Sequence, residues 1–198
     1  MIIHKVTTAP TLEPVTVEDC RKHLGIGQAG DVSRDEIIAL RIKTARLWCE
    51  SYTQSYFMRQ TITAYDDCFS SCCGNAYLDL RSPLVSVTSV KYIDSTGADI
   101  NLSNSQYFVD TVSNRITPIY NGSWPVARQQ PNSIRIEYLV GAAMVAEVDE
   151  RIKEAIKFIV LQWERFQNVS AQDAVYPPDF PNVAKNLLSE FVDRRGIF

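Results

Sequence analysis

Residues Tyr77 to Asp94 read YLDLRSPLVSVTSVKYID and carry the strongest β-strand signal in the chain. Leu78 and Leu80 alternate with more polar neighbours before Pro83, and valines alternate with serine and threonine after it. Alternation of this kind, with β-branched residues, is typical of strands that bury one face. Because proline cannot donate to a sheet ladder, we expect two strands that bend at Pro83, at an edge or a corner of a sheet.

Further strand patterns surround this stretch. They cover Met58 to Asp66, Tyr107 to Val112, Arg115 to Ile119 and Ile134 to Val140, which makes about six strands in all. The connections between them are short, which favours antiparallel pairing. We expect six apolar side chains on the inward faces of the sheet: Leu78, Leu80, Val85, Val87, Ile134 and Ile136.

Two long helical patterns flank the β-rich region. The first starts at Ser33 and keeps one apolar stripe from Ile38 to Tyr56, and the second runs from Asp149 to Phe166. A short helix is predicted after the capping box of Thr16–Asp19, and another follows a proline-rich crossing near the C-terminus. The predicted fold class is therefore α+β: a helical core of two long and two short helices, with an antiparallel β-sheet region inserted between the two long helices.

The same patterns divide the chain of 198 residues into three segments. Residues 1–56 hold an N-terminal arm, extended up to residue 15, and the first helices of the core. Residues 57–141 form the β-rich insertion, and residues 142–198 the last helices and a tail. A chain of this length can bury a real hydrophobic core.

Composition argues against several partners. The net charge is −3, so no basic excess favours strong non-specific nucleic-acid binding. No apolar run approaches the roughly 20 residues that a membrane span needs, and the first ten residues lack the apolar core of a signal peptide. We expect a protein that is made in the cytoplasm and has no membrane partner.

Catalytic motifs are scarce. The two histidines, His4 and His23, both lie near the N-terminus, and there is no G-x-S-x-G nucleophile motif. No lysine follows an acidic residue at the two-residue spacing of phage and restriction nucleases. Asp66 and Asp67 are adjacent on an extended segment, so their side chains point to opposite faces. We predict that the protein is not an enzyme and has no cofactor.

The five cysteines predict reduced thiols in preference to a metal site. Cys20 and Cys49 fall within helical patterns, where a small apolar side chain is suitable. Only Cys68, Cys72 and Cys73 cluster, and a tetrahedral zinc site would need a fourth ligand. We predict no metal, and a zinc enzyme built on these three cysteines is kept as an alternative.

Two surfaces are candidates for contacts with partners. Apolar residues broaden the first long helix beyond its core stripe, and we interpret them as a subunit interface, with a wide core face as the alternative. The C-terminal tail combines arginines with terminal apolar residues that suit a partner pocket, and the alternative is a tail folded back on its own subunit. The candidate interface residues are Ile37, Leu40, Leu47, Trp48, Arg194, Arg195, Ile197 and Phe198.

A series of short motifs along the chain resembles the pattern of a known family. They are EPVTVE at residues 13–18, HL at 23–24, LRSPLVSV at 80–87, YID at 92–94 with Gly97, YLVG at 138–141 and IKEAI at 152–156. In this order and spacing the sequence resembles the head-tail connector (adaptor) proteins of tailed bacteriophages, in the gp6-like and phiE125 gp8-like families. It departs from their pattern at Ser82, where proline is frequent, in the added segment that contains Cys68, Cys72 and Cys73, and in the C-terminal part.

The resemblance implies a structural virion protein. It would form a ring of twelve copies under the portal, at the head-tail junction, after assembly in the host cytoplasm. Its partners would be further copies of itself, the portal protein, and a head-completion (stopper) or tail protein. Genomic DNA would pass through the channel without specific binding, which a neutral or acidic total charge suits, because each fixed phosphate contact adds affinity.

A DNA-packaging protein is the alternative function. In this hypothesis the first two helices form a helix-turn-helix that binds duplex DNA. Such a motif needs cations clustered on its second helix, and the sequence supplies them only in part, as Arg34, Arg41, Lys43 and Arg46.

Overall fold

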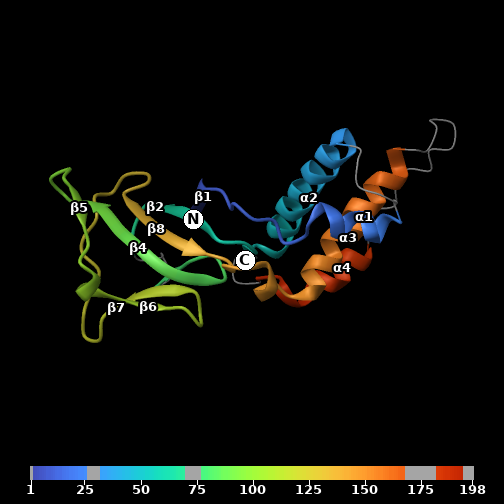
Figure 1. The fold of residues 1–198 in the computed structure, drawn as a ribbon. Coiled ribbons are helices and arrows are strands. Elements are labelled where there is room, and N and C mark those ends of the chain that lie inside the picture. Colours follow the sequence, from blue (N-terminus) through green and yellow to red (C-terminus); the bar gives the residue numbers. More distant parts are fainter. Residues whose placement is uncertain (1, 26–31, 70–76, 168–181, 194–198) are drawn as a thin grey trace. The chain divides into compact units, whose positions relative to one another are not determined.

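The computed structural model describes residues 2–25, 32–69, 77–167 and 182–193 (Figure 1). The chain forms two compact units. The β unit comprises Met1–Thr11 and Arg59–Gly141, and the helical unit comprises Leu12–Met58 and Ala142–Phe198. The β-rich segment lies in the chain between the two long helices, α2 (Val32–Thr53) and α3 (Glu150–Gln167). The predicted α+β class is therefore confirmed.

The β unit contains two antiparallel sheets (Figure 1). The first has the order β1-β2-β8-β4-β5, and the second the order β3-β7-β6. The strands of the first sheet are β1 (Ile3–Thr8), β2 (Gln60–Asp66), β8 (Ile134–Val140), β4 (Leu84–Ile93) and β5 (Asp99–Asn101). Those of the second are β3 (Leu78–Asp79), β7 (Arg115–Pro118) and β6 (Tyr107–Asp110).

At the predicted bend, Pro83, the chain passes from the second sheet to the first. Strand β3 ends before the proline and pairs with β7, whereas β4 begins directly after it and pairs with β8 and β5. The structure therefore has a corner where the alternating pattern is interrupted. It also has two strands that the pattern does not predict, β1 and β5, and both are edge strands of the first sheet.

Strand β8 supplies the centre of the buried face of the first sheet. Its pattern alternates strictly, and Ile134, Ile136, Tyr138 and Val140 are all buried. Leu78 and Leu80 are buried as predicted.

The prediction for Val85 is wrong, because its side chain is 36% exposed, and Val87 is only half-buried. Strand β4 shifts register against β8 twice, between Leu84 and Ser86 and between Val87 and Ser89. Each such shift breaks the two-residue alternation. The side chains of β4 that are buried are instead Leu84 and Val90.

The helical unit begins with α1 (Val17–Leu24), which shows the predicted capping box. Thr16 accepts from the backbone of Asp19, whose side chain accepts from the backbone of Thr16, and Gly25 ends the helix with a φ of 67°. Helix α2 begins at Val32, one residue before the start predicted from the sequence at Ser33. The helix ends at Thr53, before Gln54 with a φ of 57°, so Tyr56 lies beyond it.

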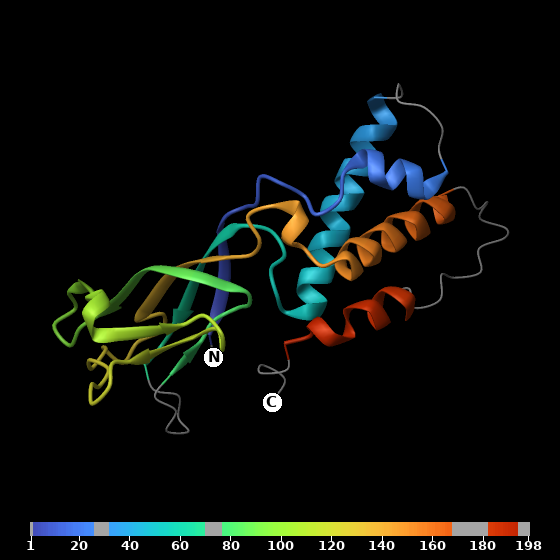
Figure 2. The same cartoon turned by 60° about the horizontal axis from the view of Figure 1, so that its bottom comes forward.

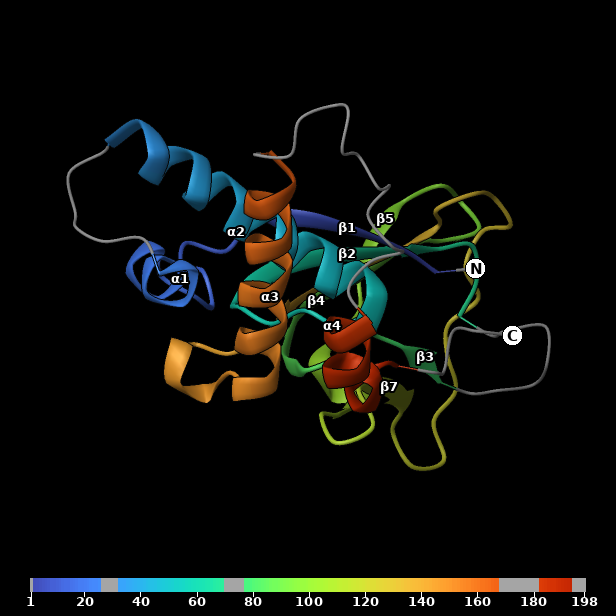
Figure 3. The same cartoon turned by 90° about the vertical axis from the view of Figure 1, so that its right-hand side faces the viewer.

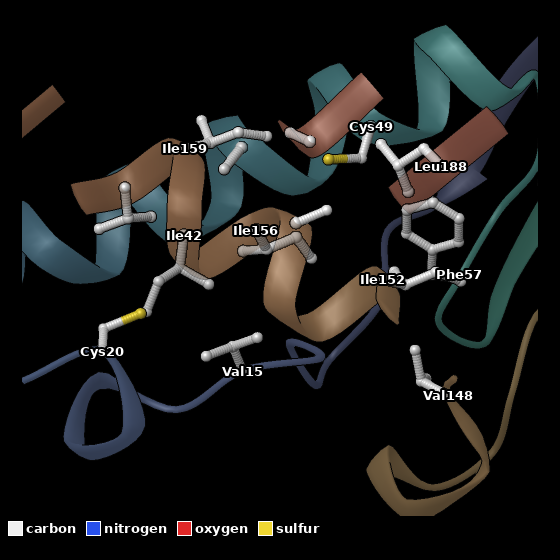
Figure 4. Packing of buried hydrophobic residues seen from close by; sticks show 14 of the residues in the cluster. Val15, Cys20, Ile42, Cys49, Phe57, Val148, Ile152, Ile156, Ile159 and Leu188 are labelled. Atoms are coloured by element: carbon white, nitrogen blue, oxygen red, sulfur yellow. The ribbon is translucent and has the colours of Figure 1, made fainter. Parts of the chain in front are cut away.

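Helix α3 is the centre of this unit. It contacts α1, α2 and α4 (Asn182–Leu188), and Figures 2 and 3 show it between α1 and α4. Ile38, Ile42, Ala45 and Cys49 form the buried stripe of α2, as the helical period predicts. Figure 4 shows part of the packing that they share with the isoleucines of α3: Ile152, Ile156 and Ile159. Within the described ranges, none of the helices combines the length and apolarity needed to cross a bilayer.

Candidate interaction surface

Three of the predicted interface residues form an exposed apolar stripe on α2. Ile37, Leu40 and Leu47 are 46%, 65% and 49% exposed. Residues three and seven positions apart lie on the same face of a helix, and this face points away from the buried stripe that contains Ile38 and Ile42. We call Ile37, Leu40 and Leu47 the α2 stripe.

The spacing of the α2 stripe suits contact with another helix. Its residues follow the alternating three- and four-residue steps of a coiled-coil seam, with Thr44 at the intervening position. The Thr44 hydroxyl donates to the carbonyl of Leu40 at 2.9 Å, so its donor is satisfied within α2. Glu36 and Lys43 are exposed and border the stripe, as polar residues border the apolar centre of a protein interface.

Trp48 differs from the α2 stripe. It is partly buried and packs against the core of the helical unit. Its indole ring stacks on the Tyr52 ring, with 5.2 Å between the ring centroids. The structure thus brings Ile37, Leu40 and Leu47 together on one exposed face and places Trp48 at the border between that face and the core.

The tail residues Arg194, Arg195, Ile197 and Phe198 lie outside the described residues. The last described residue, Asp193, follows the short helix η3 (Ser189–Phe191). Its backbone N–H donates to the carbonyl of Thr53 at 2.8 Å. The described chain therefore ends against the C-terminal end of α2.

Arg46 and Glu50 of α2 form a buried charged network with Glu13, which precedes α1, and the sequence pattern does not predict it. Arg46 is only 2% exposed, and its guanidinium donates to both carboxylate oxygens of Glu13, at 2.7 and 3.3 Å. It also donates to Glu50 at 2.7 Å. We call Glu13, Arg46 and Glu50 the polar root. The only local signal for it is the four-residue spacing of Arg46 and Glu50.

Burial and charge act against each other in the polar root. Burial lowers the pKa of Arg46, but the hydrogen bonds and charges of Glu13 and Glu50 outweigh it and raise that pKa above its ordinary value. Burial also raises the pKa of Glu50, and the charge of Arg46 and the N–H of Phe57 offset this only in part. The pair is stable because each buried charge has hydrogen-bonded partners.

The four cations required for a helix-turn-helix do not form a DNA-binding surface. Arg41 is buried and forms an ion pair with Glu164, and Arg34 lies 3.8 Å from the same carboxylate. Arg46 belongs to the polar root. Of the four, only Lys43 and Arg34 are exposed. Cations that are buried in ion pairs cannot reach phosphates.

The alternative of a zinc site rests on Cys68, Cys72 and Cys73, of which the structure describes Cys68. Cys72 and Cys73 lie outside the described residues, and no cluster of three histidine, cysteine or acidic side chains suited to a metal occurs in the portion of the chain that the structure describes. Cys20 and Cys49 are buried, as predicted from their helical positions, and burial raises the pKa of each thiol to about 12. Neither is a candidate nucleophile.

No protein-family model matches the chain, and neither does any curated protein sequence. Solved structures do match, and they show that the fold occurs in the neck of another particle. The chain is similar to a chain in the neck of the native gene transfer agent (GTA) particle, computed with C12 symmetry. The TM-score is 0.71 and the identity 16%, and the alignment covers 98% of this chain and 96% of that chain.

Two related structures give similar values. A chain in the neck of the empty particle, computed with C6 symmetry, matches with a TM-score of 0.71, 16% identity and coverage of 98% and 96%. A chain in the virion of the native particle matches with a TM-score of 0.69, 16% identity and the same coverage of both chains. At this identity the likeness is one of fold.

Proposed function

We propose that the protein is a structural, non-enzymatic component of the neck of a phage-like virion, at its head-tail junction. The observation that carries this proposal is the match to the neck chain, which covers 98% of this chain and 96% of that chain at a TM-score of 0.71. Coverage this complete includes both the β unit and the helical unit. A shared local motif would not produce it.

Within the neck, the protein acts as an adaptor that assembles into a homo-oligomeric ring of twelve copies. Two observations support this finer proposal: the neck structures were computed with C12 and C6 symmetry, and the α2 stripe offers an exposed apolar face. In a ring each subunit uses two different surfaces, so the α2 stripe would meet another patch of the next copy. The C-terminal tail, from Arg194 to Phe198, is proposed as a second contact, with the portal or a neighbouring copy.

The partners of the ring would be the portal protein on one side and a head-completion (stopper) or tail protein on the other. Genomic DNA would pass through the channel without specific binding. The net charge of −3 and the burial of Arg41 and Arg46 in ion pairs favour free passage of DNA over binding of DNA by the protein. The same two ion pairs disfavour the alternative of a DNA-packaging protein with a helix-turn-helix.

The ring is tested by the mass and shape of the purified protein. Light scattering after size exclusion and negative-stain images are expected to show a ring of twelve copies. The double variant Leu40→Glu/Leu47→Glu is expected to remain monomeric with an unchanged circular dichroism spectrum, because charges replace only exposed apolar residues. Val183→Glu is the matched control, since Val183 is a 51% exposed apolar residue of the same unit outside the stripe.

Each outcome bears on a different part of the proposal. Rings formed by the stripe variant would exclude the α2 stripe as the interface. A wild-type protein that forms no ring and does not co-sediment with the portal of its particle would overturn the adaptor function. Unchanged portal binding after deletion of residues 196–198, with the ring intact, would remove the docking role of the tail.

A further inference from the structure

The chain passes between the two units three times. The crossings lie between Thr11 and Leu12, between Met58 and Arg59, and between Gly141 and Ala142. On the side of the helical unit, the residues next to these crossings are therefore Leu12–Glu13, Phe57–Met58 and Ala142. They come from three distant parts of the sequence.

The polar root joins the first of these segments to the second. Glu13, at the first crossing, accepts two hydrogen bonds from Arg46, and Arg46 donates a third to Glu50. The other oxygen of the Glu50 carboxylate accepts the backbone N–H of Phe57 at 3.0 Å. Two side chains of α2, one turn apart, thus connect Glu13 with Phe57.

The second segment is in turn bonded to the third. The backbone N–H of Ala142 donates to the carbonyl of Phe57 at 3.0 Å, and Met58 and Ala142 form an isolated parallel bridge. An unbroken series of hydrogen bonds therefore runs from Glu13 through Arg46, Glu50 and Phe57 to Ala142. Every member of the series belongs to the helical unit.

The surroundings of the series make it costly to break. Arg46 and Glu50 are buried, and so are Phe57 and Met58. A buried charge that loses its partner keeps its desolvation cost, so removal of one member weakens the others. Members of such a network respond together, and a change at one end is felt at the other.

We propose that the polar root is a conformational clamp that holds all three chain crossings of the helical unit to one turn of α2. Glu13, Arg46 and Glu50 are its positioning residues. The clamp makes the chain at Leu12–Glu13, Phe57–Met58 and Ala142 move as one body, whereas three separate linkers would fluctuate independently. It does not depend on the ring or on any partner.

Backbone hydrogen exchange of the intact chain tests the clamp. In Glu13→Gln, which keeps the shape of the side chain and removes its charge, the amides of Phe57 and Ala142 are expected to exchange about tenfold faster, although Glu13 bonds to neither. Amides in the middle of α3 are expected to change less than about twofold. Glu18→Gln is the matched control, because Glu18 is an exposed carboxylate five residues away in the sequence.

Unchanged exchange at Phe57 and Ala142 in Glu13→Gln would overturn the clamp, since the crossings would then be held independently. Should all amides of this variant lose protection together, a double-mutant cycle of Glu13→Gln and Glu50→Gln in urea decides. The clamp predicts non-additive changes in the unfolding midpoint for these two residues, and additive changes would refute it.

Discussion

The indole of Trp48 lies nearly parallel to the ring of Tyr52, at an interplanar angle of 7° and a centroid distance of 5.2 Å. The two residues are one helical turn apart on α2, and both pack against the core of the helical unit. The helical period groups Trp48 with Leu40 and Leu47, but the stack gives Trp48 a role in the fold of the single subunit. The core and the proposed interface can therefore be tested separately on one helix.

Trp48→Ala is expected to lower the free energy of unfolding of the monomer by about 2 kcal/mol, because the variant loses a partly buried side chain and an aromatic stack. Leu47→Ala, at the neighbouring exposed position, is expected to change it by less than about 0.5 kcal/mol. Urea denaturation followed by circular dichroism, at concentrations too low for assembly, measures both. Equal effects would show that Leu47 belongs to the core.

Two positions close to the Pro83 corner are expected to respond differently to the same substitution. Leu80 is 2% exposed, so Leu80→Asp buries an unpaired carboxylate and is expected to cost about 4 kcal/mol. Val85→Asp is expected to cost less than about 1 kcal/mol, because its side chain reaches solvent. Thermal and urea unfolding test the pair, and a large loss at Val85 would contradict the register shifts of β4.

The stability of the β unit is expected to depend on the protonation of His4. Its Nδ1 lies 2.9 Å from the Tyr138 hydroxyl, and burial, followed by the charge of Arg81, lowers its pKa from 6.5 to about 4. The folded state therefore favours neutral histidine. The stabilisation that neutral His4 gives is therefore complete above pH 6.5 and is lost as the pH falls towards 4. The free energy of unfolding falls by at most about 3 kcal/mol over this range.

His4→Phe should flatten the pH dependence of stability between pH 6.5 and pH 4. Urea midpoints measured across this range for wild type and variant give the difference, and an NMR titration of the His4 ring gives the pKa directly. If both proteins lost stability with the same slope, His4 would not be the titrating group.

The buried thiols are expected to be inert in the folded protein. Burial raises the pKa of Cys20 and of Cys49 to about 12, so almost no thiolate forms at pH 8. Iodoacetamide at this pH should leave both unmodified until urea is added, while exposed Cys68 reacts and serves as the internal control. Peptide mass spectrometry identifies the sites. Rapid labelling of Cys49 in the native state would contradict its position in the core.

The sequence predicts those helices and strands that bury one face and expose the other. The stripe of Ile38, Ile42 and Cys49 and the alternation of β8 follow directly from burial on one side. Strands β1 and β5 are almost entirely exposed, so no alternation marks them, and only pairing with β2 and β4 defines them. The register shifts that expose Val85 depend on the partner strand and leave no local pattern.

The candidate surface is predictable to a similar extent. Helical geometry places Ile37, Leu40 and Leu47 off the core face. It gives only the direction of each side chain around the helix and not how deeply it is buried, so it does not separate partly buried Trp48 from these three exposed residues. The polar root is beyond such reasoning, because Glu13 and Arg46 are 33 positions apart and no periodic pattern joins them.

The order of the elements also constrains how the chain can be completed during translation. Strand β1 is synthesised before both N-terminal helices, yet its partner β2 follows them, and α3 appears only after the whole β-rich segment. The nascent chain can close its sheets once Val140 has left the ribosome, while the apolar side of α2 still lacks α3. Domains form as their segments emerge. The topology therefore allows the β unit to be completed before the core of the helical unit, and Ile38 and Ile42 of α2 lack their partners on α3 in the interval.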